Sequence, residues 1–353
     1  NAESSIVTVH GKLETATQNY IGGIARMKKV VKFGGSSLAS AEQFKKVGNI
    51  IRAEESRRYV VPSAPGKRFS ADTKVTDMLY SCYGQAILGE DAERDFEEQL
   101  EAIKERYNSI IRGLNLDLSL DEEFKTIRTN FSKKIGRDYA ASRGEYLNGI
   151  IMAAYLGYEF IDAAEVIVFD ENGDFDGDET HKILSERLEN TERAVIPGFY
   201  GAKPDGSIQT FSRGGSDITG SIVAKAVHAD MYENWTDVSG FLIADPRIIK
   251  NPKPIDVITY RELRELSYMG ATVLHEDAIF PVRKEGIPIN IRNTNAPEDK
   301  GTLIVEDTCR KPHFTITGIA GKKDFASITI EKAMMNSEVG FCRKVLELSL
   351  IHI

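Results

Sequence analysis

Two glycine-rich turns that lie far apart in the sequence constrain the fold most: Lys32-Phe33-Gly34-Gly35-Ser36 and Arg213-Gly214-Gly215-Ser216-Asp217. Each follows a stretch with strand character and opens a helical pattern. Adjacent glycines let the backbone approach a ligand closely because no Cβ intervenes, and the N–H groups at a helix start bind phosphate. The lysine, arginine and aspartate supply charges that phosphoryl transfer needs. We therefore expect the two turns to meet, with Lys32 and Arg213 on the same side, around a phosphate tail and a small anionic substrate.

Strand and helix patterns alternate along the chain, with a long helical stretch at residues 73–156. Short strands are predicted at Val30–Phe33, Tyr59–Val61, Ala194–Ile196, Met231–Trp235 and Ile287–Ile291. A helix is predicted to begin after Ser40, which forms a capping-box pattern with Gln43. This alternation predicts an α/β protein, a three-layer αβα sandwich around a mostly parallel sheet covered on both faces. Ligands bind at the carboxyl ends of strands in such sheets, where we expect both glycine turns.

Composition narrows the class of protein. A chain of 353 residues can bury the core of one large domain and a smaller one. Its net charge of −8 argues against nucleic acid or an anionic membrane surface as a partner, and no apolar run is long enough to cross a bilayer. Cys82, Cys309 and Cys342 stand far apart without a CxxC motif. Isolated buried thiols and a reducing cytoplasm are therefore expected.

The chain divides into three segments. Residues 1–26 lack the apolar region of a signal peptide, and Met27 looks like a natural start, so we expect them to be a disordered extension or an artefact. Residues 27–307 are predicted to form the main domain. Residues 308–353 open a second module, with strands at 314–320 and 327–330 and a helix at 339–350. This module ends before it could bury its apolar face, so an exposed apolar face is expected near residues 339–350.

Five motifs, in this order and spacing, resemble those of the aspartate kinases, which have the amino acid kinase fold. They are Lys32-Phe33-Gly34-Gly35-Ser36-Ser37, Arg213-Gly214-Gly215-Ser216-Asp217, Trp235-Thr236-Asp237-Val238, Ala244-Asp245-Pro246-Arg247 and Gly270-Ala271-Thr272-Val273-Leu274-His275. The resemblance makes residues 27–307 the catalytic domain. The motif Ile316-Thr317-Gly318-Ile319-Ala320 resembles the start of a regulatory ACT domain, which makes residues 308–353 an incomplete, ACT-like α+β segment.

The resemblance implies an activity. An aspartate kinase transfers the γ-phosphoryl group of ATP to the side-chain carboxylate of L-aspartate, and so begins lysine, threonine and methionine biosynthesis. ATP and Mg²⁺, the latter held through the ATP phosphates, are the implied cofactors, and the cytoplasm is the implied location. The family also implies a homodimer or higher oligomer through paired ACT domains, with lysine or threonine as an end-product effector.

The catalytic roles follow from the charge of the reactants. The acceptor carboxylate, with a pKa of about 4, is already ionised and needs no general base, so positioning and charge neutralisation remain. Lys32 is predicted to neutralise the transferring phosphoryl group, and by resemblance Asp217 orients Lys32 or a magnesium ion. Gly34, Gly35 and Ser36 would offer backbone N–H groups to the phosphates, although a plain strand-to-helix turn also uses glycine.

The resemblance also implies a set of substrate contacts. They are Ser63, Thr76, Glu145, Phe199, Arg213 and Ser216. The planar fork of Arg213 suits a carboxylate of aspartate, with help from Ser216, and Glu145 would take the ammonium group. Structural readings stay open for others: Ser63 and Thr76 as turn and cap residues, Phe199 as a core aromatic, and Ser216 with Asp217 as a helix N-cap pair.

The nucleotide contacts implied by the resemblance are Thr236, Asp237, Asp245 and Arg247. Arg247 could reach the β-phosphate, whereas Asp245-Pro246 is also an ordinary turn start. Three positions depart from the family pattern. Leu242 replaces a common tyrosine, Thr272 a common lysine, and Glu276 a common proline after His275. These departures bear on nucleotide affinity and leave the reaction type unchanged, and we expect His275 to be structural.

Other functions were weighed against this one. Another kinase of the same fold, acting on a different carboxylate or on a carbamate, stays open, as does an inactive regulatory subunit that binds amino acids. A dinucleotide-binding dehydrogenase is excluded because no GxGxxG follows a strand, and a P-loop enzyme because the chain has no GxxxxGK[ST].

Overall fold

The structure is a computed structural model that describes residues 27–212, 214–268, 274, 280–307, 316–321, 329–331, 335 and 339–352. It separates into two compact units at the Ala320–Gly321 junction. The first unit holds a large β-sheet and its covering helices, and the second holds helix α12 (Phe341–His352). Among the described residues, no helix is both long enough and apolar enough to cross a membrane.

The sheet of the first unit is mostly parallel. Its described strands follow the order β3-β4-β2-β1-β7-β9-β10-β8. Their bounds are β1 Lys29–Phe33, β2 Arg57–Pro62, β3 Glu159–Phe160, β4 Ala194–Val195, β7 Met231–Thr236, β8 Val257–Thr259, β9 Ile289–Asn293 and β10 Thr302–Val305. The strands from β3 to β9 in this order run parallel, β10 is antiparallel to β9, and β8 is parallel to β10. The predicted parallel sheet is confirmed, and its direction reverses at one edge.

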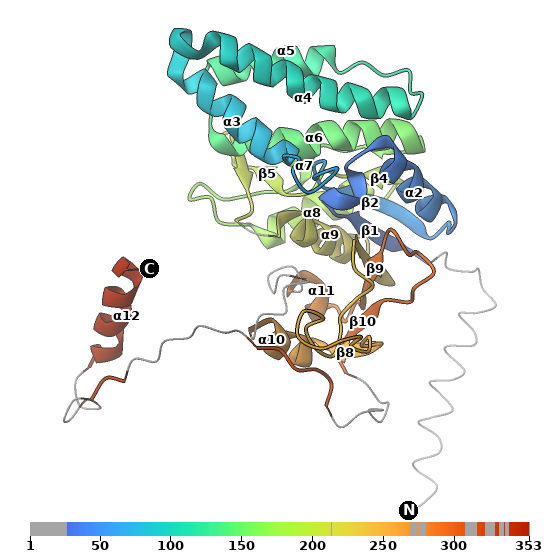
Figure 1. Cartoon of the computed structure of the whole chain (residues 1–353), viewed down its shortest axis with the longest axis vertical. Helices are drawn as coiled ribbons and strands as arrows, with labels where there is room; N and C mark the ends of the chain where they lie inside the picture. Colours follow the sequence, from blue (N-terminus) through green and yellow to red (C-terminus); the bar gives the residue numbers. More distant parts are fainter. Residues whose placement is uncertain are drawn as a thin grey trace, which may run out of the picture. The chain divides into compact units, whose positions relative to one another are not determined.

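Helices cover both faces of the sheet (Figure 1). On one face lie α2 (Ala41–Arg52), α3 (Val75–Leu88), α4 (Glu93–Gly113), α5 (Asp121–Ser132) and α6 (Arg137–Leu156). On the other lie α7 (Ala163–Val166), α8 (Gly177–Leu188), α9 (Gly215–Ala226), α10 (Tyr260–Tyr268) and α11 (Phe280–Lys284). Short 3₁₀ helices η1 (Gly35–Leu38) and η2 (Gly89–Ala92) precede α2 and α4. The predicted three-layer αβα sandwich is confirmed.

The two-residue period of the strands creates the two cores. On β1, Val30 packs into the core shared with α8 and α9, whereas Val31 and Phe33 pack into the core shared with α2 to α6. Successive side chains of a strand point to opposite faces, so a strand buried on both faces is apolar almost throughout. Lys32 departs from this rule: it is buried to 8% exposure in the middle of an apolar strand. A buried cation needs a partner.

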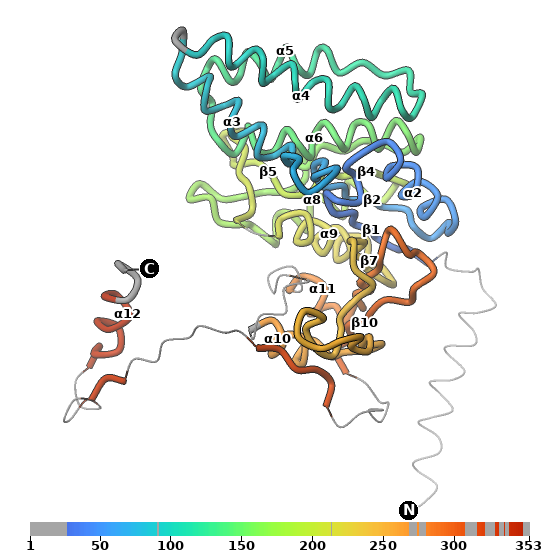
Figure 2. The backbone as a smooth tube through the Cα atoms, viewed as in Figure 1, coloured from blue at the N-terminus to red at the C-terminus, as the bar shows by residue number. Residues whose placement is uncertain are grey.

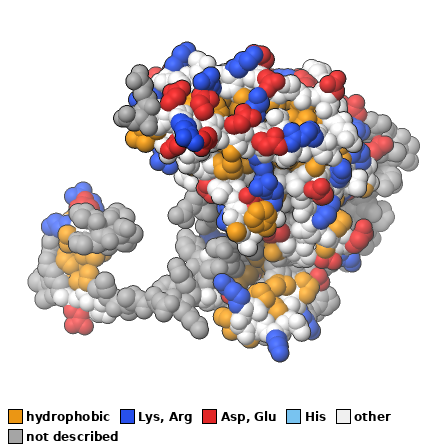
Figure 3. Space-filling view, turned by 45° about the horizontal axis from the view of Figure 1, so that its top comes forward, with side chains coloured by type: hydrophobic (Ala, Val, Ile, Leu, Met, Phe, Trp, Pro, Cys, Tyr) orange, Lys and Arg blue, Asp and Glu red, His pale blue; other side chains and the backbone are white. Residues whose placement is uncertain are grey.

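A long helical excursion, α3 to α6, separates β2 from β3 (Figure 2). On its outer surface acidic and basic side chains are interspersed in the view of Figure 3, and ion pairs such as Arg94–Glu98 and Arg128–Glu97 join them. Earlier in the chain, α2 begins where the sequence predicts, and the Ser40 hydroxyl accepts a 3.5 Å hydrogen bond from the Gln43 N–H.

The second glycine turn does not follow a strand of the central sheet, so that part of the prediction is wrong. It follows β6 (Ile208–Thr210), which pairs antiparallel with β5 (Tyr200–Ala202) in a separate two-stranded sheet. A tight turn at residues 203–207 closes this hairpin, where the Lys203 N–H donates to the Ser207 carbonyl. The hairpin returns the chain to the start of α9, which packs against β1, β2 and β7.

Other expectations have mixed outcomes. Cys82 is buried, and burial raises the pKa of its thiol to about 12. Cys342, on α12, is exposed, contrary to the prediction. Leu346 and Leu348 of α12 are 61% and 62% exposed, as expected for an uncovered apolar face. Residues 316–320 form no strand in the part that the structure describes. Residues 1–26, Cys309, and residues 314–315 and 327–328 of the two strands predicted in the second module lie outside the described residues, while residues 329–330 form no strand.

Candidate active site

The carboxyl ends of the parallel strands bring separate loops to one edge of the sheet. The first glycine turn follows β1, and the Gly34 N–H donates a 3.0 Å hydrogen bond to the carbonyl of Trp235 near the end of β7. The next residue, Thr236, accepts a 2.9 Å bond from the N–H of Thr294, which follows β9. The Ser37 and Thr294 hydroxyls are 2.8 Å apart. The glycine turn, the end of β7 and the loop after β9 are therefore joined directly.

Lys32 and Asp217 form an ion pair at this edge. The Lys32 Nζ lies 2.5 Å from Oδ1 of Asp217, in the first turn of α9. The Asn234 side chain, from β7, donates a 2.8 Å hydrogen bond to the same Oδ1 atom. The Tyr232 hydroxyl donates to the Asp217 backbone carbonyl at 3.1 Å. Two strands and one helix thus hold the Asp217 carboxylate against the lysine. Asn234 was not predicted, although it lies two residues before Thr236 on the same face of β7.

The first glycine turn is shaped by a close contact with the loop after β2. A Cβ atom on Gly35 would lie 2.8 Å from the Ala64 carbonyl oxygen, and one on Gly66 would lie 2.6 Å from the carbonyl carbon of Gly35. The Gly66 N–H donates a 2.8 Å hydrogen bond to the Gly35 carbonyl. Glycine is thus required here for backbone packing. The Gly34 N–H is already used by Trp235, so the prediction that it serves phosphate is corrected, and Gly35 and Ser36 are left as the N–H donors at the start of η1.

Glu145 is a buried carboxylate with one open oxygen, meaning an oxygen without a hydrogen-bond partner in the described chain. It lies on α6 at 6% exposure, and its Oε1 accepts a 3.0 Å hydrogen bond from the Ala64 N–H. Its Oε2 is buried and has no partner within the described chain. Burial raises the pKa of Glu145 to about 8, and the Ala64 N–H, Lys32 and Arg143 oppose that shift. The Ser63 N–H, one residue before Ala64, donates a 3.0 Å hydrogen bond to the Phe33 carbonyl, so the loop that holds Glu145 is joined to the residue after Lys32. A buried carboxylate with an open oxygen suits a cationic group of a ligand.

Asn148 follows Glu145 by one helical turn and was not predicted from the sequence. Its side chain is 0% exposed, and its Nδ2 donates a 2.6 Å hydrogen bond to the Ser63 carbonyl. Its Oδ1 is buried and unpartnered among the residues that the structure describes. The predicted substrate residue Ser63 is thereby tied to α6 through its backbone. Its neighbour Ala64 is tied to Glu145, so α6 holds this loop at two successive residues.

The second glycine turn packs against Phe199. The φ of Phe199 is +84°, in the region that favours glycine, and its N–H donates a 3.1 Å hydrogen bond to the Thr219 hydroxyl of α9. A Cβ on Gly215 would lie 2.6 Å from the Phe199 ring, and one on Gly198 would lie 2.6 Å from the Ser216 hydroxyl. Phe199 is half-buried beside α9, so the structure brings Phe199 and Ser216 together.

Of the remaining predicted substrate residues, the structure describes Thr76 but not Arg213. A Cβ on Gly144 would lie 3.7 Å from the Thr76 hydroxyl, so Thr76, on α3, lies beside the turn of α6 that carries Glu145. Arg213, which carried the predicted carboxylate contact, lies outside the described residues, and so do Thr272, His275 and Glu276. The expected meeting of Lys32 and Arg213 therefore stays a prediction.

The predicted nucleotide residues form a second, more exposed group. The Arg247 guanidinium is paired with Asp245 at 2.7 Å, which lowers the pKa of that carboxyl. The Arg247 side chain is 87% exposed. Thr236 is half-buried at the end of β7, and its hydroxyl donates to the exposed Asp237 at 3.3 Å. Among the described residues, the hydrogen bonds of the Arg247 side chain go to Asp245. Leu242 is 38% exposed.

The chain is similar to proteins of known function. Residues 27–293 match the model of the amino acid kinase family. The chain is 41% identical over 342 residues to aspartokinase 3 of Bacillus subtilis, covering 91% of this chain and 72% of that protein. Its fold matches the crystal structure of Clostridium acetobutylicum aspartate kinase with a TM-score of 0.82 and 54% identity, covering 92% and 73% of the two chains. For E. coli aspartokinase III in complex with aspartate and ADP, the TM-score is 0.69 at 26% identity, over 80% and 65% of the chains.

Proposed function

The chain belongs to the aspartokinases of the amino acid kinase family, and from that premise we propose how its residues transfer the γ-phosphoryl group of ATP to the side-chain carboxylate of L-aspartate. The product is 4-phospho-L-aspartate. One observation carries the proposal: a buried cation, Lys32, lies near the end of β1, and the loop bonded to that strand end also binds Glu145, a buried carboxylate with one unpartnered oxygen in the described chain. Such a pair can hold a phosphate on one side and an amino acid on the other.

Lys32 is the proposed centre of phosphoryl transfer. Both reactants are anions, so the barrier is lowered mainly by placing them together and by neutralising the charge that builds up between them. Lys32 carries the positive charge, and Asp217, fixed by Asn234, holds its ammonium in one position. The acceptor carboxylate is already ionised at neutral pH. The site therefore needs no general base.

Glu145 is the proposed recognition residue for aspartate. Its open Oε2 would accept hydrogen bonds from the α-ammonium group of aspartate, and the charge on that group would favour ionised Glu145. Ser63, Thr76, Phe199 and Ser216 are the further proposed substrate contacts, and Arg213 is the proposed partner of a substrate carboxylate. Support comes from E. coli aspartokinase III, which was solved in complex with aspartate and ADP.

The nucleotide is proposed to approach from the ends of β1 and β7. The N–H groups of Gly35 and Ser36 would bind phosphate oxygens, while Thr236, Asp237, Asp245 and Arg247 would contact the rest of ATP. Mg²⁺ is proposed to bind as a companion of the ATP phosphates. When bound, it would neutralise phosphate charge, and the Asp217 carboxylate is the residue that would hold it.

Three broader features are also proposed. Residues 308–353 are an incomplete ACT regulatory segment, and residues 27–307 are the catalytic domain. The protein acts in the cytoplasm, and paired ACT domains make it a homodimer or a higher oligomer. The resemblance of residues 316–320 to an ACT domain supports the regulatory segment and its pairing. An E. coli relative was solved in complex with lysine and aspartate, which supports lysine as the effector.

A trapping assay tests the proposed reaction. The chain is incubated with ATP, Mg²⁺ and L-aspartate, and hydroxylamine converts any acyl phosphate to a hydroxamate while ADP release is followed. Glutamate, acetylglutamate and UMP serve as rival acceptors. We expect hydroxamate with aspartate alone. Equal hydroxamate from glutamate would move the assignment to another carboxylate kinase of this fold, and a lack of turnover with every acceptor would favour a regulatory amino-acid-binding subunit.

A further inference from the structure

We propose that Asn148 is a second ligand for the α-ammonium group of the amino acid substrate, acting beside Glu145 through its open Oδ1. The inference rests on the proposed function, because it takes the ammonium of aspartate as the cation in this site. Neither the motifs nor the comparisons assign a role to Asn148. It is the contacts of its side chain that point to a ligand.

The orientation of the Asn148 amide is determined by its partner. The Ser63 carbonyl can only accept a hydrogen bond, so the amide nitrogen must face it at 2.6 Å. The Oδ1 atom then points away from Ser63. It is buried and finds no donor within the described part of the chain. A buried acceptor without a donor is rare in folded proteins, and it indicates a bound partner such as a ligand or an ordered water.

Glu145 and Asn148 lie on one face of α6, against the same loop. Residues three apart on a helix are neighbours on one face. Each side chain bonds to one of two adjacent loop residues, Glu145 to the Ala64 N–H and Asn148 to the Ser63 carbonyl. Both side chains are therefore aligned against one short segment of backbone. Each has one oxygen left over, and both of these oxygens are shielded from solvent.

The chemistry of two acceptors selects the kind of ligand. A carboxylate oxygen and an amide oxygen on one helix face offer no hydrogen to a ligand while Glu145 is ionised, so they would repel a phosphate or a carboxylate. An ammonium group has three donors and no acceptor, which matches this pair. In a site without water, each such hydrogen bond is strong when made and costly when left unmade. Asn148 should therefore contribute to the preference for an amino acid over the same diacid without the amino group.

Succinate, which is aspartate without its amino group, separates this role from a structural one. Dissociation constants for aspartate and succinate are measured by calorimetry on the full chain, its Asn148→Leu variant and its Asn148→Asp variant. In Asn148→Leu we expect aspartate to bind about tenfold more weakly and succinate to bind within about twofold of wild type. Asn148→Asp keeps an oxygen toward the ammonium but adds a negative charge, which repels the carboxylates of both ligands. Both ligands should weaken there, while the preference for aspartate is kept.

Asn130→Leu is the matched control. Asn130, on α5, donates to the Tyr139 hydroxyl at 2.8 Å, so this variant loses the same kind of bond away from the loop at Ser63, and we expect it to bind both ligands normally. Equal weakening of aspartate and succinate in Asn148→Leu would overturn the inference and leave Asn148 as a support for the loop. Unchanged binding would also overturn it, with a water as the partner of Oδ1. If the wild-type chain binds no aspartate at all, the proposed function itself fails.

Discussion

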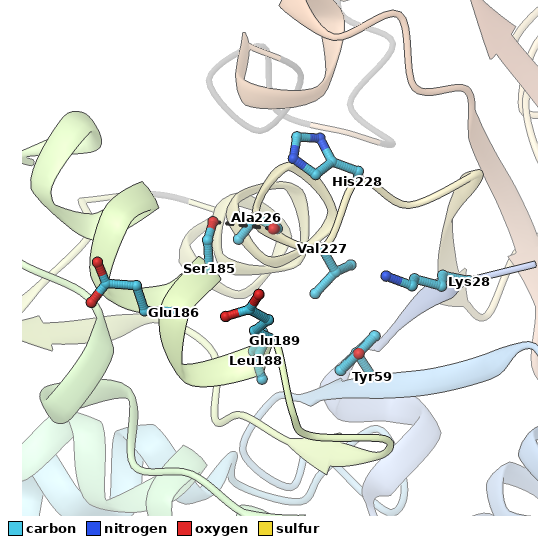
Figure 4. Close-up of a pocket in the computed structure, with 9 residues that line it drawn as sticks. All are labelled: Lys28, Tyr59, Ser185, Glu186, Leu188, Glu189, Ala226, Val227 and His228. Carbon is cyan, nitrogen blue, oxygen red and sulfur yellow. Dashed lines mark hydrogen bonds between the residues drawn. The ribbon is translucent and has the colours of Figure 1, made fainter.

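The two ends of the parallel strands, which form the amino-terminal and carboxyl-terminal edges of the central sheet, differ in how their polar groups are hydrogen-bonded. The amino-terminal edge carries an open groove of about 380 Å³ between the ends of α8 and α9 (Figure 4). Its hydroxyls are engaged: Tyr59 donates to the Thr191 carbonyl at 3.0 Å, and Ser185 to the Ala226 carbonyl at 3.1 Å. Its charged side chains, Lys28 and Glu189 among them, extend into solvent.

The carboxyl-terminal edge shows the opposite pattern. There, Lys32 is buried in an ion pair, and Glu145 and Asn148 each keep a buried oxygen open in the part of the chain described. A hollow whose polar groups already have hydrogen-bond partners does not indicate a ligand, whereas a buried acceptor without a donor does. The comparison teaches that unsatisfied polar chemistry, rather than the size of a hollow, marks the functional edge of this sheet.

Removing one lysine from each edge should give the largest contrast. In Lys32→Ala the rate of phosphoryl transfer is expected to fall about a thousandfold, because the charge on the moving group is no longer neutralised. The fold should persist, since Asp217 still accepts the Asn234 bond. Steady-state turnover and circular dichroism measure the two effects. Lys28→Ala, at the groove, is the control and should leave turnover unchanged. An unaltered rate in Lys32→Ala would remove Lys32 from its role.

In Glu145→Gln the KM for aspartate should rise about thirtyfold. The reason is that the ammonium group of aspartate then meets a neutral amide instead of a negative charge. In the wild type, the raised pKa of about 8 makes binding of the ammonium release a proton. Aspartate affinity should therefore rise as the pH approaches about 8, and this dependence should vanish in Glu145→Gln. An identical pH profile in both proteins would show that Glu145 does not face the ammonium.

The same pKa makes a prediction for stability. Between about pH 4.5 and about pH 8 the folded chain keeps the Glu145 proton, while the unfolded chain has released it. The free energy of unfolding without ligand should therefore fall as the pH rises through this window. Glu145→Gln should lack this part of the slope. Urea unfolding at about pH 5, 7 and 9 compares the two proteins, and parallel curves would contradict the burial of an open carboxylate.

A smaller effect is expected at Asn234. In Asn234→Leu the Asp217 carboxylate loses one of the two groups that hold its Oδ1, so the position of the Lys32 ammonium becomes less defined. We expect kcat to fall about fivefold to tenfold with little change in the KM for aspartate. A change confined to the KM would place Asn234 on the substrate side instead.

The smallest effect is expected at the groove. Ser185→Ala removes the hydrogen bond to the Ala226 carbonyl and should lower the free energy of unfolding by about 1 kcal/mol. Activity should stay unchanged, because the groove lies at the opposite ends of the strands from Lys32. A loss of turnover in this variant would break the contrast between the two edges.

Local patterns predicted much of the fold. The apolar run before the first glycine turn predicted β1, and the Ser40–Gln43 pair predicted the start of α2, because both depend on residues close in sequence. The reversed direction of β10 and β8 was not predicted. Strand direction depends on the path of the connecting loops through space. The spacing of apolar residues along a strand contains no information on that path. The hairpin of β5 and β6 was missed for the same reason.

The site residues also divide into those that a local motif predicted and those whose role depends on distant partners. Lys32 and Asp217 were predicted because each lies in a glycine-rich motif with recognisable chemistry, and the structure places them 2.5 Å apart. Asn148 and Asn234 were missed because their roles come from distant partners, Ser63 across 85 positions and Asp217 across 17. An asparagine on a helix or strand carries no local signal of such a contact. The tight contact of Gly35 with Gly66 was hidden for the same reason.

A crystal structure of the chain with L-aspartate and a non-hydrolysable ATP analogue tests the central claim most directly. The account predicts the aspartate ammonium within about 3 Å of Glu145 Oε2 and Asn148 Oδ1, with the terminal phosphate at the Lys32 ammonium. Aspartate bound in the groove between α8 and α9, or at the carboxyl-terminal edge with both oxygens still unpartnered, would contradict it.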